Sequence, residues 1–545
     1  MQTREYPKLS YNLDYLTQLW EEAGILNWVV SPGSRNAPIV AALLKNKSFT
    51  LHSAPDERSG AFVALGIAQS NQFPAAFLCT SGTALVNAHS AVCEAYYQRI
   101  PLLIVSADRP EHLIDQWDGQ TLRQSGIFGS YSRQSLHLNA RNLQSTECAS
   151  QVYELIQASL QPIPGPVHIN IALDEPIYEG VADPRFTQSP VPPFVFQEFH
   201  QYQAPTLEKL QEIFDNLSVS TPKIAILIGH STPNHPISEV LKRLQHTLPI
   251  FTDVCSHQCR FGLANWDWGL LKRDIPDNLK PDLLITLGTT VLSKPLKQKL
   301  KDWKPAHLHL GIYGEVGDPF QTQPLHWKGY ESDQLETILI AIDQHPVWKN
   351  EVKDFKESWA QFIFQQSLTP QDLPKPFSFE LEWIYHFLQQ LNGETHIVQM
   401  GNSMPIRYAS WSFPIKSPLY ANRGVSGIDG SISTAFGTAY ANPNKHVFAV
   451  VGDVSTIYDS NAFWMDFPSN LTVIVINNQG GRIFDWISGP NQFPPLAPFI
   501  HTPKSFDFSK IADFFQVPFC KLPIADFNNS VKSALAVSSG IVELM

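Results

Sequence analysis

The sequence predicts an α/β protein made of three doubly wound domains with mostly parallel sheets. Short apolar runs recur along the chain, and each ends in a polar turn followed by a helical pattern, which is typical of β-turn-α units. The 545 residues exceed what one hydrophobic core organises. Proline-bearing stretches at 183–205 and 369–376 interrupt this rhythm and indicate junctions. We therefore expect domains at residues 1–182, 206–345 and 375–545.

The composition indicates a soluble globular protein with large cores. Charged residues make up 16% of the chain, hydrophobic residues 43%, and the net charge is −11. An acidic balance argues against a nucleic-acid partner, which needs a basic face. No apolar run reaches the ~18 residues of a membrane-spanning helix, and residues 1–7 lack the apolar centre of a signal peptide. We expect no membrane insertion.

The cysteines are too few and too scattered for a disulfide scaffold, so a reducing cytoplasm is the expected location. Cys255 and Cys259 are close enough in sequence to suggest zinc. No second Cys/His pair lies nearby, so a zinc site is not predicted. The six cysteines are Cys79, Cys93, Cys148, Cys255, Cys259 and Cys520.

The first domain opens with an amphipathic helical pattern at 9–26 and a short strand at 28–30. The turn at 31–38 carries two hydroxyls and Arg35, a combination suited to gripping a carboxylate or phosphate. Glu57 precedes the next helix, where the helix dipole also favours acidic residues for purely structural reasons. Further strands are expected at 51–54, 75–79, 102–106 and 167–171, and further helices at 61–68, 84–97 and 144–160.

The second domain is predicted from strands at 223–229 and 283–288 and from a helical region at 331–367. No Gly-x-Gly-x-x-Gly follows any strand here, so a dinucleotide site is not predicted. The third domain opens with a helix at 378–391 and a strand at 396–400. The β-turn-α rhythm of the first domain therefore returns in both.

Two strands of the third domain lead to a pair of polar turns. Residues 446–451 end in Gly452-Asp453, and residues 471–476 end in Asn477-Asn478. Asp453 and Asn478 offer oxygen ligands suited to Mg²⁺ shared with the phosphates of a ligand, and glycines let backbone approach a diphosphate. Ordinary strand-to-loop turns favour the same residue types, so this pair alone leaves both interpretations open.

The pair resembles the thiamine diphosphate fingerprint, and further loops make the resemblance specific. With them, the chain closely resembles the MenD family of thiamine diphosphate-dependent enzymes from about residue 10 to residue 545. The resemblance implies a pyrimidine-binding domain at 1–182, a central α/β domain at 206–345 and a diphosphate-binding domain at 375–545, together forming the thiamine diphosphate-binding fold. The further loops, in chain order, are Ser31-Pro32-Gly33-Ser34-Arg35, Asp56-Glu57-Arg58, Thr80-Ser81-Gly82-Thr83, Ser106-Ala107-Asp108-Arg109-Pro110, Gly401-Asn402-Ser403 and Asn422-Arg423-Gly424-x-Ser426-Gly427-Ile428-Asp429-Gly430.

The resemblance implies that thiamine diphosphate binds with Mg²⁺ or Mn²⁺. Asp453, Asn478 and the Gly480 carbonyl would hold the metal ion. Glu57 would contact the aminopyrimidine ring and act as the catalytic proton shuttle. Ile428 would be the apolar wedge beneath the cofactor. The other implied cofactor-binding residues are Gly401, Asn402, Ser403, Gly452, Val454 and Ser455.

The implied activity is that of a transferase of menaquinone biosynthesis. It decarboxylates 2-oxoglutarate and adds the resulting carbanion to isochorismate in a 1,4 fashion, giving 2-succinyl-5-enolpyruvyl-6-hydroxy-3-cyclohexene-1-carboxylate and CO₂. Both substrates are dicarboxylates, for which bidentate Arg is the natural ligand. The family often has Arg after Ser-Lys, but here Pro295 follows Lys294, so one cationic contact of the central domain is either missing or supplied by Lys297. The implied substrate-binding residues are Ser34, Arg35, Arg109, Gln120, Lys294, Arg407, Arg423, Ile483 and Phe484.

The family places its cofactor between the pyrimidine-binding domain of one subunit and the diphosphate-binding domain of another. A homodimer or a dimer of dimers (a homotetramer) is therefore expected. Two alternatives remain open at this point. One is another thiamine diphosphate-dependent 2-oxo acid decarboxylase or carboligase, which would not need the arginine set. The other is a non-catalytic scaffold that retains the fold.

Overall fold

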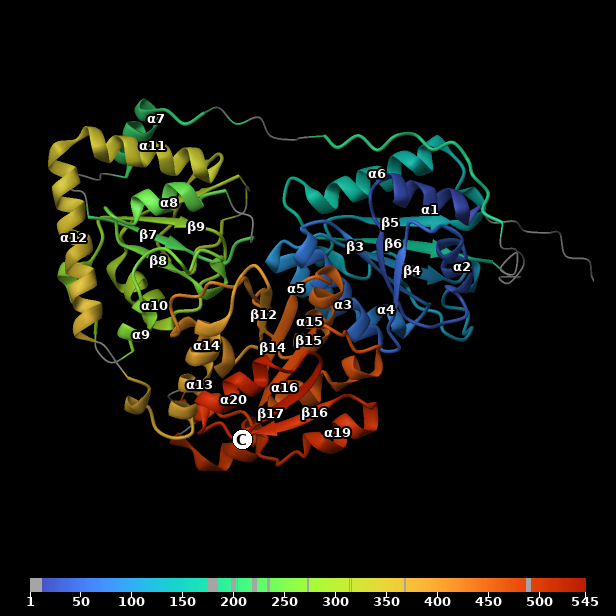
Figure 1. The fold of residues 1–545 in the computed structure, drawn as a ribbon. Coiled ribbons are helices and arrows are strands. Elements are labelled where there is room, and N and C mark those ends of the chain that lie inside the picture. The colour runs from blue at the N-terminus through green and yellow to red at the C-terminus, as the bar shows by residue number, and fades with distance from the viewer. Residues whose placement is uncertain are drawn as a thin grey trace, which may run out of the picture.

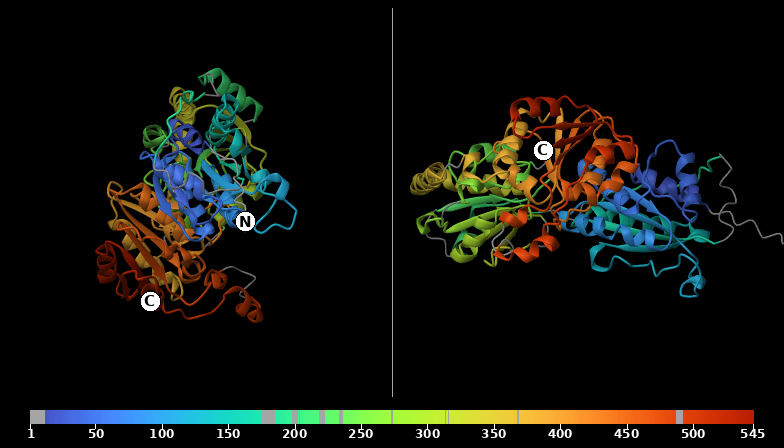
Figure 2. Two further views of the ribbon diagram at one scale, coloured as in Figure 1. Left: turned by 90° about the vertical axis from the view of Figure 1, so that its right-hand side faces the viewer. Right: turned by 90° about the horizontal axis from the view of Figure 1, so that it is seen from below.

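Three parallel sheets, one for each expected domain, form the framework of the protein (Figure 1). The first (blue to cyan) and central (green to yellow) domains lie side by side, and the third (orange to red) lies across both. Seen from below, the third domain occupies the middle (Figure 2). These sheets confirm the predicted α/β class. The computed structural model describes residues 12–545 apart from 175–184, 198–201, 203, 218–222, 233–235, 272–273, 313, 315, 367–368 and 487–491.

The first domain contains a six-stranded sheet in the order β2-β1-β3-β4-β6-β5, in which all neighbours are parallel. The edge strand β5 was not predicted, because Ser135, His137 and Asn139 break its apolar pattern. The strands of the first domain are β1 (Asn27–Val30), β2 (Thr50–Ser53), β3 (Ala75–Cys79), β4 (Leu102–Asp108), β5 (Ser135–Asn139) and β6 (Pro166–Ala172). Its helices are α1 (Leu13–Glu22), α2 (Ala37–Lys45), α3 (Glu57–Asn71), α4 (Thr83–Asn87), α5 (His89–Gln98) and α6 (Thr146–Leu160).

Two helix predictions in this domain need correction. The helix expected at 9–26 is shorter and ends at Glu22, and residues 9–11 lie outside the described part of the chain. The helix expected at 84–97 is interrupted at Ala88 and forms α4 and α5. The described residues of the linker expected at 183–205, namely 185–197, 202, 204 and 205, contain neither helix nor strand.

The central domain contains a five-stranded parallel sheet in the order β11-β10-β9-β7-β8. The helical region expected at 331–367 forms two helices, because Pro346 begins the second and cannot donate a backbone hydrogen bond. Strands β8, β10 and β11 were not predicted. The strands are β7 (Ile224–Ile228), β8 (Ile250–Thr252), β9 (Leu283–Leu287), β10 (Ala306–Gly311) and β11 (Leu325–Lys328). The helices are α7 (Leu207–Asn216), α8 (Ser238–Leu244), α9 (Trp266–Gly269), α10 (Lys294–Trp303), α11 (Glu331–Gln344) and α12 (Pro346–Gln365).

The third domain contains a six-stranded parallel sheet in the order β13-β12-β14-β15-β17-β16. Its strands are β12 (His396–Met400), β13 (Leu419–Ala421), β14 (His446–Gly452), β15 (Leu471–Ile476), β16 (Phe519–Leu522) and β17 (Gly540–Leu544). Its helices are α13 (Phe377–Gln390), α14 (Met404–Ser410), α15 (Ser431–Ala441), α16 (Asp453–Tyr458), α17 (Ile483–Trp486), α18 (Ala497–Ile500), α19 (Phe508–Phe515) and α20 (Phe527–Leu535). Among the described residues, no helix is both long and apolar enough to cross a bilayer.

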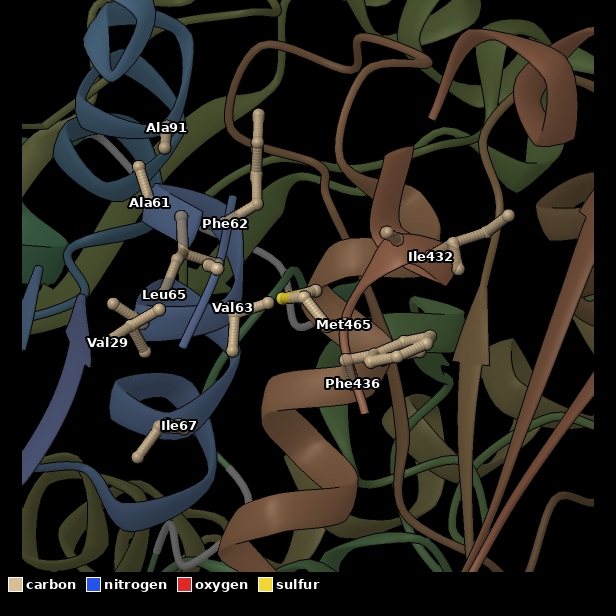
Figure 3. Packing of buried hydrophobic residues seen from close by; sticks show 14 of the residues in the cluster. Val29, Ala61, Phe62, Val63, Leu65, Ile67, Ala91, Ile432, Phe436 and Met465 are labelled. Atoms are coloured by element: carbon tan, nitrogen blue, oxygen red, sulfur yellow. The ribbon is translucent and has the colours of Figure 1, made fainter. Parts of the chain in front are cut away.

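Helices α3 and α15 join the first and third domains through one shared core (Figure 3). Phe62 and Val63 of α3 and Phe436 of α15 are among its buried residues. Glycines allow the two helices to approach closely. A Cβ at Gly66 would lie 2.1 Å from the Thr434 carbonyl oxygen. A Cβ at Gly437 would lie 2.0 Å from the carbonyl oxygen of Val63, so neither position has room for a side chain.

Adding one methyl group at this crossing is expected to destabilise the protein. Gly437→Ala should lower the free energy of unfolding by about 1–3 kcal/mol, because backbone blocks the new Cβ. Circular dichroism during urea unfolding measures the midpoint. The control is Gly314→Ala, since a Cβ at Gly314 meets no atom within 4 Å. Equal midpoints for the two variants would contradict this account of the crossing.

Asp459 holds the start of α15 from within the core. Its carboxylate accepts hydrogen bonds from the backbone N–H groups of Ile432 and Ser433, at 2.8 and 2.7 Å, and from Ser433 Oγ at 2.7 Å. Asp459 is fully buried, and burial raises its pKa from the ordinary 3.8 to about 6, although the Ser433 hydrogen bonds and the charge of Arg58 lower it. The folded state therefore binds this proton more tightly than the unfolded state.

This pKa predicts how stability depends on pH. Between pH 7 and pH 4 the contribution of Asp459 to the free energy of unfolding should increase as pH falls, by up to about 3 kcal/mol. Asp459→Asn removes the titration, so the unfolding midpoint of the wild type should rise relative to that of the variant between pH 7 and pH 4.5. Denaturant titrations at a series of pH values measure the difference. A difference independent of pH would show that the pKa of Asp459 is not raised.

Candidate active site

A cavity of about 510 Å³ opens at the carboxyl edge of the third sheet. Strands β12, β14 and β15 are parallel neighbours, so the turns that follow them meet at this edge. Asn402, Asp453 and Asn478 come from these three turns and line the cavity. Its volume lies within the ~300–1,000 Å³ of typical ligand pockets. Other predicted site residues in its lining are Ser403, Arg407, Arg423, Ile428, Gly452, Val454, Ser455, Gly480, Ile483 and Phe484.

Asp453 is fixed by backbone hydrogen bonds. Its Oδ1 accepts from the N–H of Val454 at 2.7 Å, and its Oδ2 accepts from the N–H of Gly480 at 2.8 Å. The residue is 2% exposed, and this burial raises the pKa of Asp453 while the N–H groups lower it. A cation beside a desolvated carboxylate would stabilise its charged form.

Asn478 has a partner that the sequence did not predict. Its Nδ2 donates to Oε1 of Glu380 at 3.0 Å, and Glu380 Oε2 accepts from the Tyr408 hydroxyl at 2.6 Å. Glu380 lies in the first turn of α13 and also lines the cavity. Its sequence position gave no functional signal, because acidic residues are common at helix starts.

The residues around the cavity fit a divalent cation and a diphosphate. Asp453, Asn478 and the Gly480 carbonyl are oxygen ligands of the kind that Mg²⁺ and Mn²⁺ prefer. Among the described residues, no group of three or more His, Cys, Asp or Glu could hold a metal ion, so a cation here would depend on amide and carbonyl oxygens as well as on Asp453. Helices α14 and α16 both begin at the cavity, and helix N-termini attract phosphate. A Cβ at Gly452 would meet no atom within 4 Å, so a ligand can approach this backbone.

Two arginines give the cavity positive charge. Arg407 Nη1 donates to the Ser403 carbonyl at 2.5 Å, and Arg423 Nη1 donates to Asn402 Oδ1 at 2.9 Å. Burial lowers the pKa of Arg407, and the charge of Arg423 lowers it further. In the part of the chain that the structure describes, neither guanidinium forms an ion pair with a carboxylate. The pair therefore suits an anionic ligand.

The loop that carries Arg423 is held by the first domain. Glu94 of α5 accepts hydrogen bonds from the backbone N–H groups of Gly424 and Val425, at 2.6 and 2.8 Å. Glu94 is 1% exposed, and burial raises its pKa while the N–H groups and the charge of Arg423 lower it. The sequence did not predict this contact, because Glu94 lies within an ordinary helical pattern 330 positions before Gly424.

Lys294, the substrate-binding residue predicted in the central domain, does not line the cavity. It begins α10, and Pro295 stands next to it in the first turn. Burial lowers the pKa of Lys297, and the charge of Arg423 lowers it further. Lys297 does not line the cavity either.

A second cavity of about 470 Å³ lies where all three domains meet. It is lined by Arg99 and Arg133 of the first domain and by His230 and His307 of the central domain. Arg423 lines both cavities, and it is the only predicted site residue in the lining of the second. The predicted site residues of the third domain therefore gather at the first cavity rather than at the second.

The predicted residues of the first domain gather at a different place. Each lies on a loop or helix start at the carboxyl edge of the first sheet. None of them lines either cavity of this chain. Gly401 is also absent from the lining, because its backbone N–H pairs with the Val450 carbonyl inside the third sheet at 2.8 Å. The first-domain residues are Ser34, Arg35, Glu57, Arg109 and Gln120.

Arg35 and Arg109 make contacts inside the first domain. Arg35 is 3% exposed, and its Nη1 donates to the Leu173 carbonyl at 2.9 Å. Arg109 Nε lies 3.8 Å from Asp118 Oδ2. In this chain Arg35 is therefore turned inward.

Glu57 begins α3 and is partly exposed. Its neighbours tie the start of α3 to the third domain: Asp56 Oδ2 accepts from Asn461 Nδ2 at 2.7 Å, and Arg58 Nη2 donates to the Tyr458 carbonyl at 2.7 Å. These contacts lie at and beyond the far end of α16, away from its first residue at the cavity. One chain therefore brings together the residues predicted to bind the metal ion and the diphosphate but not Glu57.

Comparison with known proteins finds thiamine diphosphate-binding domains in this chain. Residues 13–127 match the family described as thiamine pyrophosphate enzyme, N-terminal TPP binding domain, and residues 399–542 match the C-terminal TPP binding domain. A relative from Flavobacterium johnsoniae is 32% identical over 529 residues, covering 95% of this chain and 92% of its own. A relative from Cytophaga hutchinsonii is 35% identical over 506 residues, covering 90% and 87%.

A third relative, from Bacteroides fragilis, is 34% identical over 495 residues, covering 88% of this chain and 84% of its own. All three relatives carry the same name, 2-succinyl-5-enolpyruvyl-6-hydroxy-3-cyclohexene-1-carboxylate synthase. The identity extends over both cofactor-binding domains and the domain between them. The chain belongs to the family of thiamine diphosphate-dependent 2-succinyl-5-enolpyruvyl-6-hydroxy-3-cyclohexene-1-carboxylate synthases.

Proposed function

We propose that this chain decarboxylates 2-oxoglutarate and adds the resulting four-carbon unit to isochorismate, a step of menaquinone biosynthesis. The observation that carries the proposal is the pair Arg407 and Arg423 in the cavity beside Asp453. Both substrates are dicarboxylates, and guanidinium groups bind carboxylates in a bidentate manner. The names of the relatives support the same reaction.

The cofactor end of the cavity would be organised by the third domain. Asp453, Asn478 and the Gly480 carbonyl would hold Mg²⁺ or Mn²⁺, and Asn402, Ser403 and Ser455 would bind the diphosphate. When bound, thiamine diphosphate supplies the nucleophilic carbon and the electron sink that decarboxylation of a 2-oxo acid needs. Ile428 would support the cofactor from below, and Ile483 and Phe484 would form an apolar wall that limits water.

The active site would be completed by a second copy of the chain. Glu57 would exchange a proton with the aminopyrimidine ring, but it does not line the cavity of its own chain. The same edge of the first sheet carries Ser34, Arg35, Arg109 and Gln120. Association of two chains would therefore bring this whole set from one chain to the cavity of the other. We therefore propose a homodimer or a dimer of dimers, with domains at 1–182, 206–345 and 375–545.

Lys294 of the central domain would help to bind the substrates, and Lys297 would replace the arginine that the family often has after Ser-Lys. The described cysteines are all free thiols, which supports the reducing cytoplasm as the location.

Product analysis tests the proposed reaction. The holoenzyme is supplied with 2-oxoglutarate, with and without isochorismate, and CO₂ and the condensation product are followed by mass spectrometry. We expect the adduct to form only when isochorismate is present. Equal CO₂ release with no adduct would favour a general 2-oxo acid decarboxylase instead, and no CO₂ release with either mixture would indicate a non-catalytic scaffold.

A further inference from the structure

Glu380 occupies an unusual position for a carboxylate. It is 2% exposed, and with Asp453 it is one of only two carboxylates among the described residues that line the cavity. Each of its oxygens accepts one hydrogen bond: Oε2 from the Tyr408 hydroxyl at 2.6 Å, and Oε1 from Asn478 Nδ2 at 3.0 Å. Tyr408 is itself fully buried, so its hydroxyl offers Glu380 a fixed anchor.

The contact between Glu380 and Asn478 decides which end of the Asn478 amide faces the cavity. The amide of Asn has an oxygen that accepts and a nitrogen that donates, and the two ends have nearly the same shape. Only the oxygen can bind a cation. A carboxylate accepts hydrogen bonds and offers none, so Glu380 attracts the nitrogen of Asn478 and leaves its oxygen for the cavity.

Glu380 is poorly placed to bind the cation itself. Its oxygens are directed at the side chains of Tyr408 and Asn478, whereas backbone N–H groups orient the carboxylate of Asp453 beside Gly480. A buried partner that orients a metal ligand is a familiar way of tuning metal affinity. Tyr408, Glu380 and Asn478 thus form a chain of hydrogen bonds that ends at the cavity.

We infer that Glu380 is a positioning residue that selects the metal-binding orientation of Asn478. The inference rests on the proposed role of the cavity as a cation and diphosphate site, and it goes beyond that role by naming what makes Asn478 a competent ligand. Glu380 acts through Asn478 and takes no part in the chemistry. Removal of the Glu380 carboxylate should therefore weaken binding of the cation before it affects any other property.

Glu380→Gln tests this role, because an amide can present either an oxygen or a nitrogen to Asn478. Mg²⁺ is titrated by calorimetry into full-length protein saturated with thiamine diphosphate. We expect the dissociation constant for Mg²⁺ to rise about 10–100-fold. Glu382→Gln is the matched control on the same helix, and it should leave the dissociation constant unchanged.

A reciprocal exchange separates positioning from a merely structural role. Asn478→Asp alone places two carboxylates against each other and should weaken Mg²⁺ binding. In the double variant Glu380→Gln/Asn478→Asp the donor and the acceptor change sides, and an oxygen still faces the cavity. We expect the double variant to recover most of the affinity that either single variant loses.

Two results would overturn the inference, and they are distinguishable. If the wild type binds Mg²⁺ and Glu380→Gln binds it equally well, Glu380 does not position Asn478, whatever the thermal stability of the variant. If the wild type itself shows no Mg²⁺-dependent binding of thiamine diphosphate, the proposed cofactor site fails and the inference fails with it. A double variant that binds Mg²⁺ no more tightly than the single variants would also contradict the exchange of donor and acceptor.

Discussion

Replacing Glu57 by Gln is expected to lower kcat about 10²–10⁴-fold while thiamine diphosphate still binds. The amide keeps the size of the side chain and can still contact the aminopyrimidine ring. It cannot exchange a proton with the ring nitrogen, which is the role proposed for Glu57. Because the residues proposed to bind the metal ion and the diphosphate belong to the third domain, cofactor affinity should change little.

Steady-state kinetics and calorimetric titration of the cofactor separate these two effects. Glu147→Gln is a matched control, because Glu147 is also an acidic residue in the first turn of a helix of the same domain and is exposed. It should leave both quantities unchanged. Wild-type turnover in Glu57→Gln would refute the proton-shuttle role.

Asp453→Ala is expected to weaken Mg²⁺-dependent cofactor binding by about 100-fold or more. Loss of a residue that only supports a metal ligand costs about 10–100-fold, and Asp453 is the one carboxylate among the three proposed ligands. It also accepts hydrogen bonds from Val454 and Gly480, so its removal frees the turn that carries the Gly480 carbonyl. Chelation of the metal in the wild type should produce the same loss.

Asp453→Asn separates loss of the negative charge from loss of the hydrogen bonds that hold the turn, since the amide retains an oxygen acceptor but carries no charge. Asp513→Ala, at an exposed position of α19, is the control. Calorimetric titration of thiamine diphosphate with and without Mg²⁺ measures the effect. Mg²⁺-dependent binding of normal affinity in Asp453→Ala would place the cation elsewhere.

The sequence predicted the parts of the fold that depend on local pattern. Strands β14 and β15 are continuous apolar runs, so both strands and the polar turns after them were predictable. The edge strand β5 was missed because water reaches one side of it and polar residues interrupt it. The interruption between α4 and α5 has no proline or glycine at Ala88 to mark it.

The site shows the same division between local and long-range information. The turns after β12, β14 and β15 meet in one cavity, as parallel strands require. Glu380 and Glu94 were missed, because the site residues that they contact, Asn478 and Gly424, lie 98 and 330 positions away and only tertiary packing reveals the contacts. The inward direction of Arg35 was equally invisible, since a motif gives the position of a side chain and not its orientation.

The central claim is that each active site combines Glu57 of one chain with Asp453 of another. Glu57→Gln and Asp453→Ala are each expected to be nearly inactive alone. When the two variants are co-expressed, half of the dimers are mixed, and each mixed dimer contains one site with both residues intact. We predict that condensation activity then recovers to about a quarter of the wild-type rate. If both residues served a site within one chain, every site in the mixture would lack one of the two residues. An inactive mixture would therefore contradict the site shared between chains.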